Sequence, residues 1–242
     1  MQQNSHTSDP TKDEINVPES KLPIKPMTME MLEEAIRERI VEVNKEFTDG
    51  LEFIKTYHKT VTFFGSARFK ENHPYYQKAR VLAGQLSEAG YAVVTGGGPG
   101  IMEGGNRGAY EAGGSSLGLT IELTHEQATN PYVTGHVGFH YFFTRKVCLT
   151  FSAEAFVYFP GGYGTLDEFF EILTLVQTKK ITRVPIILVG KEYWAPLHEF
   201  IQKTIYEKFQ AIDDIDMDLY TILDDPETIV DLIKMSPVRF DG

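Results

Sequence analysis

The sequence has very little sulfur and no excess of positive charge. Its 242 residues contain one cysteine, Cys148, within an apolar stretch. One thiol cannot build a disulfide framework or a cysteine-rich metal site, so the composition fits a reducing, cytoplasmic compartment. A small buried hydrophobe is a commoner role for such a residue than a nucleophile. The net charge of −11 argues against sequence-independent nucleic-acid binding, in which Lys and Arg neutralise phosphates.

Long hydrophobic runs and several common enzyme motifs are also lacking. No apolar run approaches the roughly 20 residues that span a bilayer, so we expect no membrane association. The P-loop pattern G-x-x-x-x-G-K-[ST] and the serine-nucleophile pattern G-x-S-x-G do not occur. The glycine run that begins at Gly96 fails the dinucleotide pattern G-x-G-x-x-G, because Ile101 stands where the last glycine is required. A P-loop NTPase, an α/β-hydrolase and an NAD enzyme are therefore disfavoured, and a mononucleotide phosphate remains the natural ligand.

Metal ligands at a suitable spacing are scarce. His136 and His140 are four residues apart, which would suit a metal if they lay on a helix. The intervening Val-Gly-Phe is poor helix sequence, and no acidic ligand stands at a matching distance. We therefore expect no metal and no other cofactor.

Strand and helix patterns alternate along most of the chain. Residues 1–27 are polar and proline-punctuated, so we expect a disordered tail there. A helical pattern runs from Thr28 to about His58, and Asp49-Gly50 could divide it into two helices. The rest alternates between strand and helix at least five times, which is typical of a doubly wound parallel sheet. We predict an α/β fold in which residues 28–242 form one Rossmann-like nucleotide-binding domain with N-terminal helices.

Small residues follow three of the expected strands. In sheets of this kind, ligands bind outside the carboxyl ends of the strands, where the strand order reverses. Backbone without side chains can approach a ligand closely, and a helix N-terminus offers free N–H groups to phosphate. We expect the three turns to meet at one edge of the sheet; they are Gly65-Ser66, Gly96–Gly100 and Gly161–Gly164. The stretch from Glu122 to Gly138 is expected to be a looser connection.

The third turn has two interpretations. It runs through Pro160–Glu168, between a buried strand and an amphipathic helix, and it would place Glu168 in the first helical turn. There Glu168 could present a carboxylate to the bound ligand. Thr165 and Glu168 also fit a Thr-x-x-Glu capping box, in which the carboxylate only accepts a backbone N–H. The motif alone fits both interpretations.

Arg145 is a second candidate, at the expected start of another helix. It follows the strand-like aromatic run Tyr141-Phe142-Phe143 and precedes Lys146. Cations at a helix N-terminus oppose the macrodipole, so they do not stabilise the helix. An anion held between two helix N-termini would offset this placement, which favours a functional role over a solvated basic pair.

Taken together, these segments resemble the LONELY GUY family, whose members are often mislabelled as lysine decarboxylases. The resemblance rests on Gly96–Met102, on Arg145-Lys146 and on P-G-G-x-G-T-x-x-E at Pro160–Glu168, and it covers about Val61 to Leu197. It implies homodimers whose active site is completed near the subunit interface. It also implies hydrolysis of the N-glycosidic bond of nucleoside 5′-monophosphates, giving free base and ribose 5-phosphate. Some members use cytokinin riboside monophosphates, and others act on AMP or related nucleotides.

The resemblance also assigns roles to individual residues. It makes Arg145 and Glu168 the catalytic pair. An acidic residue after the third strand would accept hydrogen bonds from ribose hydroxyls; this could be Glu122 or Glu126, and the spacing favours Glu122. The substrate- and phosphate-binding positions are, in addition, Ser66, Gly97, Gly98, Gly100, Lys146, Gly161, Gly162, Gly164, Thr165 and Thr174.

The preferred base is left open, because the glycine loop is one residue shorter than in the plant pattern and Glu103 replaces a glycine. A nucleotide-binding module without turnover is the alternative. It would share the glycine loops without requiring both members of the catalytic pair.

Overall fold

The computed structural model describes residues 27–122, 128–151 and 153–237. The chain divides into two units, Met1–Arg39 and Ile40–Gly242. In the first unit, the described residues from Met29 onward belong to α1 (Met29–Ile54). Just before this helix, the Thr28 hydroxyl accepts the N–H of Met31 at 3.2 Å. The tail expected at the N-terminus lies almost entirely outside the described residues, and the single-domain organisation stays a prediction.

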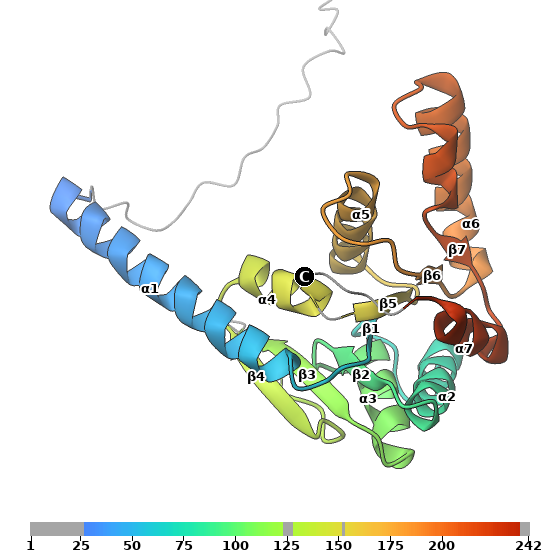
Figure 1. Cartoon of the computed structure of the whole chain (residues 1–242), viewed down its shortest axis with the longest axis horizontal. Coiled ribbons are helices and arrows are strands. Elements are labelled where there is room, and N and C mark those ends of the chain that lie inside the picture. The colour runs from blue at the N-terminus through green and yellow to red at the C-terminus, as the bar shows by residue number, and fades with distance from the viewer. Residues whose placement is uncertain (1–26, 123–127, 152, 238–242) are drawn as a thin grey trace, which may run out of the picture. The chain divides into compact units, whose positions relative to one another are not determined.

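A parallel sheet of seven described strands forms the centre of the second unit (Figure 1). The strands are β1 (Thr60–Phe64), β2 (Ala92–Thr95), β3 (Ser116–Ile121), β4 (Gly135–Phe139), β5 (Ala153–Tyr158), β6 (Ile186–Leu188) and β7 (Thr221–Ile222). Their spatial order is β4-β3-β2-β1-β5-β6-β7. The chain builds outward from β1 to β4 and then returns to β5 on the other side of β1, so the order reverses between β1 and β5. The predicted α/β doubly wound sheet is confirmed.

Helices cover both faces of this sheet, as Figure 1 shows. They are α2 (Pro74–Glu88), α3 (Ile101–Glu111), α4 (Phe142–Phe151), α5 (Tyr163–Gln177), α6 (Lys191–Phe200), which continues as a π-helix (Ile201–Lys208), and α7 (Pro226–Met235), with a 3₁₀ helix at Asp214–Asp218. Among the described helices, none is both long and apolar enough to cross a membrane.

The two faces form separate hydrophobic cores. Along β1, Val61 and Phe63 pack into the core with α2, α3 and α7, whereas Phe64 packs into the core with α4, α5 and α6. β5 alternates in the same way, with Val157 in the first core and Phe156 in the second. A strand buried on both faces is mostly apolar, so these strands are recognisable in the sequence as short hydrophobic runs.

One strand was missed. The expected loose connection from Glu122 to Gly138 contains most of β4, which pairs in parallel with β3. Its sequence, Gly-His-Val-Gly-Phe, offers one β-branched residue and no apolar run, because it forms the edge of the sheet and leaves part of one face exposed. His136 lies on this strand and His140 just after it, so the two histidines do not have the helical spacing that a shared metal would need.

The expected break at Asp49-Gly50 is wrong, because α1 continues without interruption to Ile54. Gly50 is buried and packs closely against Cys148 and Phe139. A Cβ atom at this position would lie 2.6 Å from Sγ of Cys148 and 2.8 Å from the ring of Phe139. The missing side chain thus lets α1 approach α4 closely within the second unit.

We expect Gly50→Ala to destabilise the protein. Alanine is the better helix former by about 1 kcal/mol, but forcing a methyl group into a packed core costs about 1–3 kcal/mol. Gly84, inside α2, is the matched control, since a Cβ there would meet only the Gly108 carbonyl at an ordinary 3.5 Å. Urea unfolding of both variants measures the difference, and a Gly50→Ala protein as stable as Gly84→Ala would contradict the close packing of α1 on α4.

Candidate active site

A cleft of about 840 Å³ lies at the carboxyl edge of the sheet, at the point where the strand order reverses between β1 and β5. It is lined by seven of the residues predicted from sequence: Ser66, Arg145, Gly161, Gly162, Gly164, Thr165 and Glu168. A somewhat larger cavity of about 940 Å³, near the C-terminal end of α5, contains none of the predicted site residues. The cleft is therefore the candidate site, although it is the smaller of the two cavities.

The start of α5 excludes the capping box. The helix begins at Tyr163 with Gly162 at the N-cap, and no side chain caps it. Thr165 and Glu168 are therefore both inside the helix, and Glu168 stands in the second turn rather than the first. Thr165 packs beneath Gly161, since a Cβ on that glycine would lie 2.1 Å from the threonine Oγ1. The carboxylate of Glu168 is thus not used to end a helix.

The same helix start gives the cleft a donor-rich end. The first N–H groups of an α-helix have no partner within the helix, and residues 162–165 line the cleft. A neighbouring contact fixes this turn, because the hydroxyl of Tyr193 donates to the Gly161 carbonyl at 2.8 Å. This end of the cleft suits an anionic group such as phosphate.

Arg145 enters the cleft from the first turns of α4. Its guanidinium lies against Gly96, where a Cβ would come within 2.6 Å of Nη2 and 2.8 Å of Sδ of Met102. Its Nε is buried and has no hydrogen-bond partner among the described residues. An unsatisfied buried donor in a cleft is costly unless a ligand uses it.

The electrostatics of Arg145 and Glu168 are coupled. Burial lowers the pKa of Arg145, and the nearby charge of Glu168 opposes that change. Burial also raises the pKa of Glu168 above its ordinary value of 4.5, and the charges of Arg145 and Lys146 offset this only in part. Two titratable groups with pKa values displaced by burial in one cleft are typical of a functional site.

Other predicted contacts lie outside the cleft lining. The Nζ atom of Lys146 forms ion pairs with Asp167 at 2.5 Å and Glu171 at 2.9 Å. Thr174 is exposed and its hydroxyl donates to the Phe170 carbonyl at 2.7 Å.

The acidic candidates after β3 also lie outside the lining. Glu122 is largely exposed, with Oε2 3.7 Å from Nδ1 of His140, although its neighbour Ile121 lines the cleft. Glu126 lies outside the described residues. Within the described part of the chain, no cluster of three His, Cys, Asp or Glu side chains is placed to hold a metal ion.

The glycine loop after β2 supports the cleft from behind. Gly97, Gly98 and Gly100 are buried and do not line it. Gly100 has a positive φ of 73°, and a Cβ there would lie 2.2 Å from the carbonyl oxygen of Ser66. The next residue, Ile101, donates its N–H to the same oxygen at 3.0 Å. The loop thereby fixes the turn that carries Ser66 into the cleft.

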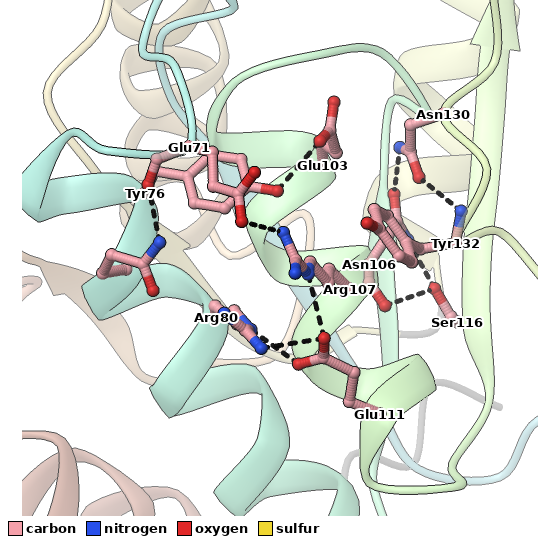
Figure 2. A network of polar contacts seen from close by, with 11 residues as sticks. Glu71, Tyr76, Arg80, Glu103, Asn106, Arg107, Glu111, Ser116, Asn130 and Tyr132 are labelled. Atoms are coloured by element: carbon pink, nitrogen blue, oxygen red, sulfur yellow. Dashed lines mark hydrogen bonds and ion pairs between the residues drawn. The ribbon is translucent and has the colours of Figure 1, made fainter.

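A buried amide network holds the glycine loop itself (Figure 2). The Oδ1 atom of Asn106 on α3 accepts hydrogen bonds from the Thr95 hydroxyl at 2.6 Å and from Nδ2 of Asn130 at 2.9 Å. The Nδ2 atom of Asn106 donates to the Ser116 hydroxyl and to the Leu117 carbonyl. Asn130 reaches the carbonyls of Gly97 and Gly98. Sequence reasoning missed both asparagines, since nothing in their spacing separates a buried amide from an exposed one.

Arg107 belongs to a different kind of network. Figure 2 shows it on the same helix, forming ion pairs with Glu71 at 2.5 Å and Glu111 at 2.9 Å, while Arg80 also contacts Glu111. Both glutamates are partly or largely solvent-exposed.

We expect Asn106→Ala to cost roughly 3 kcal/mol or more, because it leaves several fully buried polar groups without partners. Arg107→Ala is the control next to it, and its loss of partly exposed ion pairs should cost only about 1 kcal/mol. Chemical denaturation compares the two free energies of unfolding. Equal losses would show that the amide network does not hold the loop.

The fold and the cleft together define a doubly wound α/β protein with a cleft suited to an anion at the switch point of its sheet. A family model described as "Possible lysine decarboxylase" matches residues 102–233, more than half of the chain. The chain belongs to this family, the LONELY GUY family.

Relatives are about a third identical to this chain over the aligned residues. A probable cytokinin riboside 5′-monophosphate phosphoribohydrolase of Oryza sativa subsp. japonica is 33% identical over 162 residues, which is 63% of each chain. The cytokinin riboside 5′-monophosphate phosphoribohydrolase of Rhodococcoides fascians is 30% identical over 155 residues, 62% of this chain and 78% of that protein. The match thus spans less than two thirds of the rice relative.

Solved structures support the fold. The molybdenum cofactor carrier protein of Chlamydomonas reinhardtii has a TM-score of 0.54 at 20% identity, covering 74% of this chain and 97% of that one. The molybdenum cofactor binding protein of Rippkaea orientalis has a TM-score of 0.51 at 20% identity, covering 73% and 94%. At this identity the likeness concerns the architecture alone.

Proposed function

We propose that this protein hydrolyses the N-glycosidic bond of nucleoside 5′-monophosphates, either AMP or a cytokinin riboside monophosphate, to free base and ribose 5-phosphate. The observation that carries the proposal is the meeting of Arg145 and Glu168 in one cleft with the uncapped start of α5. The names of the curated relatives support the same reaction.

The substrate phosphate binds at the start of α5. Gly162, Gly164 and Thr165 form that wall, and Ser66 faces it from the turn after β1. An anion here is stabilised by the free N–H groups and by the positive end of the helix macrodipole. The ribose then lies deeper along the helix, near Glu168 in its second turn.

The chemistry is a dissociative displacement by water. As the bond from C1′ to the base nitrogen breaks, its electron pair leaves with the base, which takes up a proton, and positive charge develops on the ribose. The carboxylate of Glu168 stabilises that charge or takes a proton from the attacking water, whose oxygen forms the new bond to C1′. Arg145 binds the phosphate or the sugar and fixes its orientation, which lowers the entropic cost of reaction.

The label of lysine decarboxylase gains no support from the cleft. Decarboxylation through a Schiff base needs a lysine amine at the reacting centre. No lysine is among the described residues that line the cleft, and Lys146 is engaged by two carboxylates.

The family resemblance implies a homodimer, and we propose one for this chain. Support comes from the outer surface of α4, where large apolar side chains are solvent-exposed: Phe142 57%, Phe143 47%, Val147 44% and Phe151 45%. Apolar surface concentrated in this way is typical of an interface.

Light scattering of the protein should give twice the mass of the chain, and a monomer mass at micromolar concentration would contradict the proposed homodimer.

We expect Glu168→Gln to lower the rate of base release from AMP by about 10²- to 10⁴-fold, because the amide cannot stabilise the ribose charge or accept a proton. Liquid chromatography of the released adenine measures the rate. Glu171→Gln, one turn further along α5 and outside the cleft lining, is the control and should keep most of the activity. Full activity of Glu168→Gln would refute the assigned role.

Tight AMP binding by the wild-type protein without release of base would favour the alternative function, a non-catalytic nucleotide-binding module.

The pH profile of the same assay adds a second readout. An acid with a raised pKa keeps its proton to higher pH, and the proposed role requires ionised Glu168. Activity should therefore appear as the pH rises through a value above 4.5 and be lost below it. An acid limb at or below 4.5 would contradict the burial of this carboxylate.

A further inference from the structure

A second carboxylate, outside the cleft, is buried at the start of α4. Glu46 on α1 is only 5% exposed. Its Oε1 accepts the N–H of His140 at 2.5 Å, and both of its oxygens lie 3.3 Å from the N–H of Tyr141. The hydroxyl of Thr144, in the first turn of α4, donates to Oε2. Burying a charge is costly unless hydrogen bonds satisfy it, and here backbone and hydroxyl donors do so.

α1 and α4 meet at two contacts that are one helical turn apart on each helix. Glu46 and Gly50 are one turn apart on α1, and Thr144 and Cys148 are one turn apart on α4. Glu46 meets Thr144, and Gly50 lies against Cys148. Two contacts spaced by a helical turn fix both the rotation and the axial position of one helix on the other.

Arg145 is the residue directly after Thr144. Its own N–H donates to the Tyr141 carbonyl at 3.3 Å, so its backbone position depends on Tyr141, whose N–H group Glu46 accepts. Arg145 and Lys146 also place positive charge near the N-terminus of a helix, which opposes the macrodipole. The carboxylate of Glu46 places a negative charge at this helix start, where it interacts favourably with the macrodipole.

We propose that Glu46 is a positioning residue for Arg145, and that α1 thereby forms part of the active-site framework. The placement of Arg145 by Glu46 rests on the contacts alone, whereas the effect of Glu46 on catalysis rests on the proposed function. Glu46→Gln keeps the size of the side chain but turns one acceptor into an N–H₂ donor facing other donors. The start of α4 then moves, and Arg145 shifts from its place against Gly96 and near Glu168.

The first test reads this shift without using catalysis. Carbon-13 NMR titration of the glutamate carboxyls in the full chain follows Glu168, which is identified by the signal missing in Glu168→Gln. The charged groups that act on this carboxyl are Arg145, Lys146 and Asp167. Since Arg145 lowers the pKa of Glu168, its displacement in Glu46→Gln should raise that pKa. An unchanged Glu168 titration in a folded Glu46→Gln protein would overturn the proposal.

Two further variants keep the test decisive. Glu42→Gln removes the same charge from an exposed position one turn earlier on α1 and should leave the Glu168 titration unchanged. Thr144→Val removes a single hydrogen bond from the contact and should shift the titration in the same direction by a smaller amount. If Glu46→Gln does not fold, the Glu168 titration in Thr144→Val decides the question instead. A shift of equal size in Glu42→Gln would show a general charge effect and would also overturn the proposal.

Activity provides a separate arm. Misplacing a substrate-orienting group by about 1 Å costs up to about 10²-fold, so kcat/KM of Glu46→Gln should fall about 10- to 10²-fold and the acid limb should move to higher pH. Wild-type kcat/KM in Glu46→Gln would contradict the catalytic consequence. If the wild-type protein released no base from any nucleotide, the proposed function would fail, whereas the NMR titration would still decide whether Glu46 positions Arg145.

Discussion

The structure depends on holding two opposite charges partly out of water at the edge of a parallel sheet. Neither Arg145 nor Glu168 is placed where its own helix gains stability. The arginine opposes the dipole of α4, and the glutamate is buried enough to raise its pKa. Such an arrangement persists only when the surroundings fix it, and much of the unit consists of those surroundings. The amide network around Asn106 and the interlocked turns at Gly100 and Ser66 hold the loops behind the cleft. We propose that the contact of α1 with α4 does the same for Arg145.

The order of strands explains why the charges meet there. Because the chain returns to β5 beside β1, the turn after β1 and the turn after β5 lie side by side. The first leads to α2 on one face of the sheet and the second to α5 on the other, so a crevice opens between them. Both α4 and α5 start at the cleft, so each contributes one catalytic candidate from its first two turns. A phosphate at the start of α5 would supply the negative charge that this end of the cleft lacks.

Much of the fold was predictable, because the central strands are apolar on both faces and the helices have clear periods. The edge strand β4 was not, since its half-exposed Gly-His-Val-Gly-Phe carries little hydrophobic signal. The sequence also predicted the residues that meet in the cleft, but it placed Glu168 one turn too early and left the capping box open. Glu46, Asn106 and Asn130 could not be found, because a buried polar group is defined by partners far away in the chain.

The most direct test of the central claim is a double-mutant cycle on base release from AMP, with Arg145→Met, Glu168→Gln and the double variant. If the two side chains act on one substrate in one cleft, their effects are strongly non-additive, and the double variant is about as slow as the slower single variant. A double variant whose loss equals the product of the two single losses would show that they act independently. That result would contradict the account.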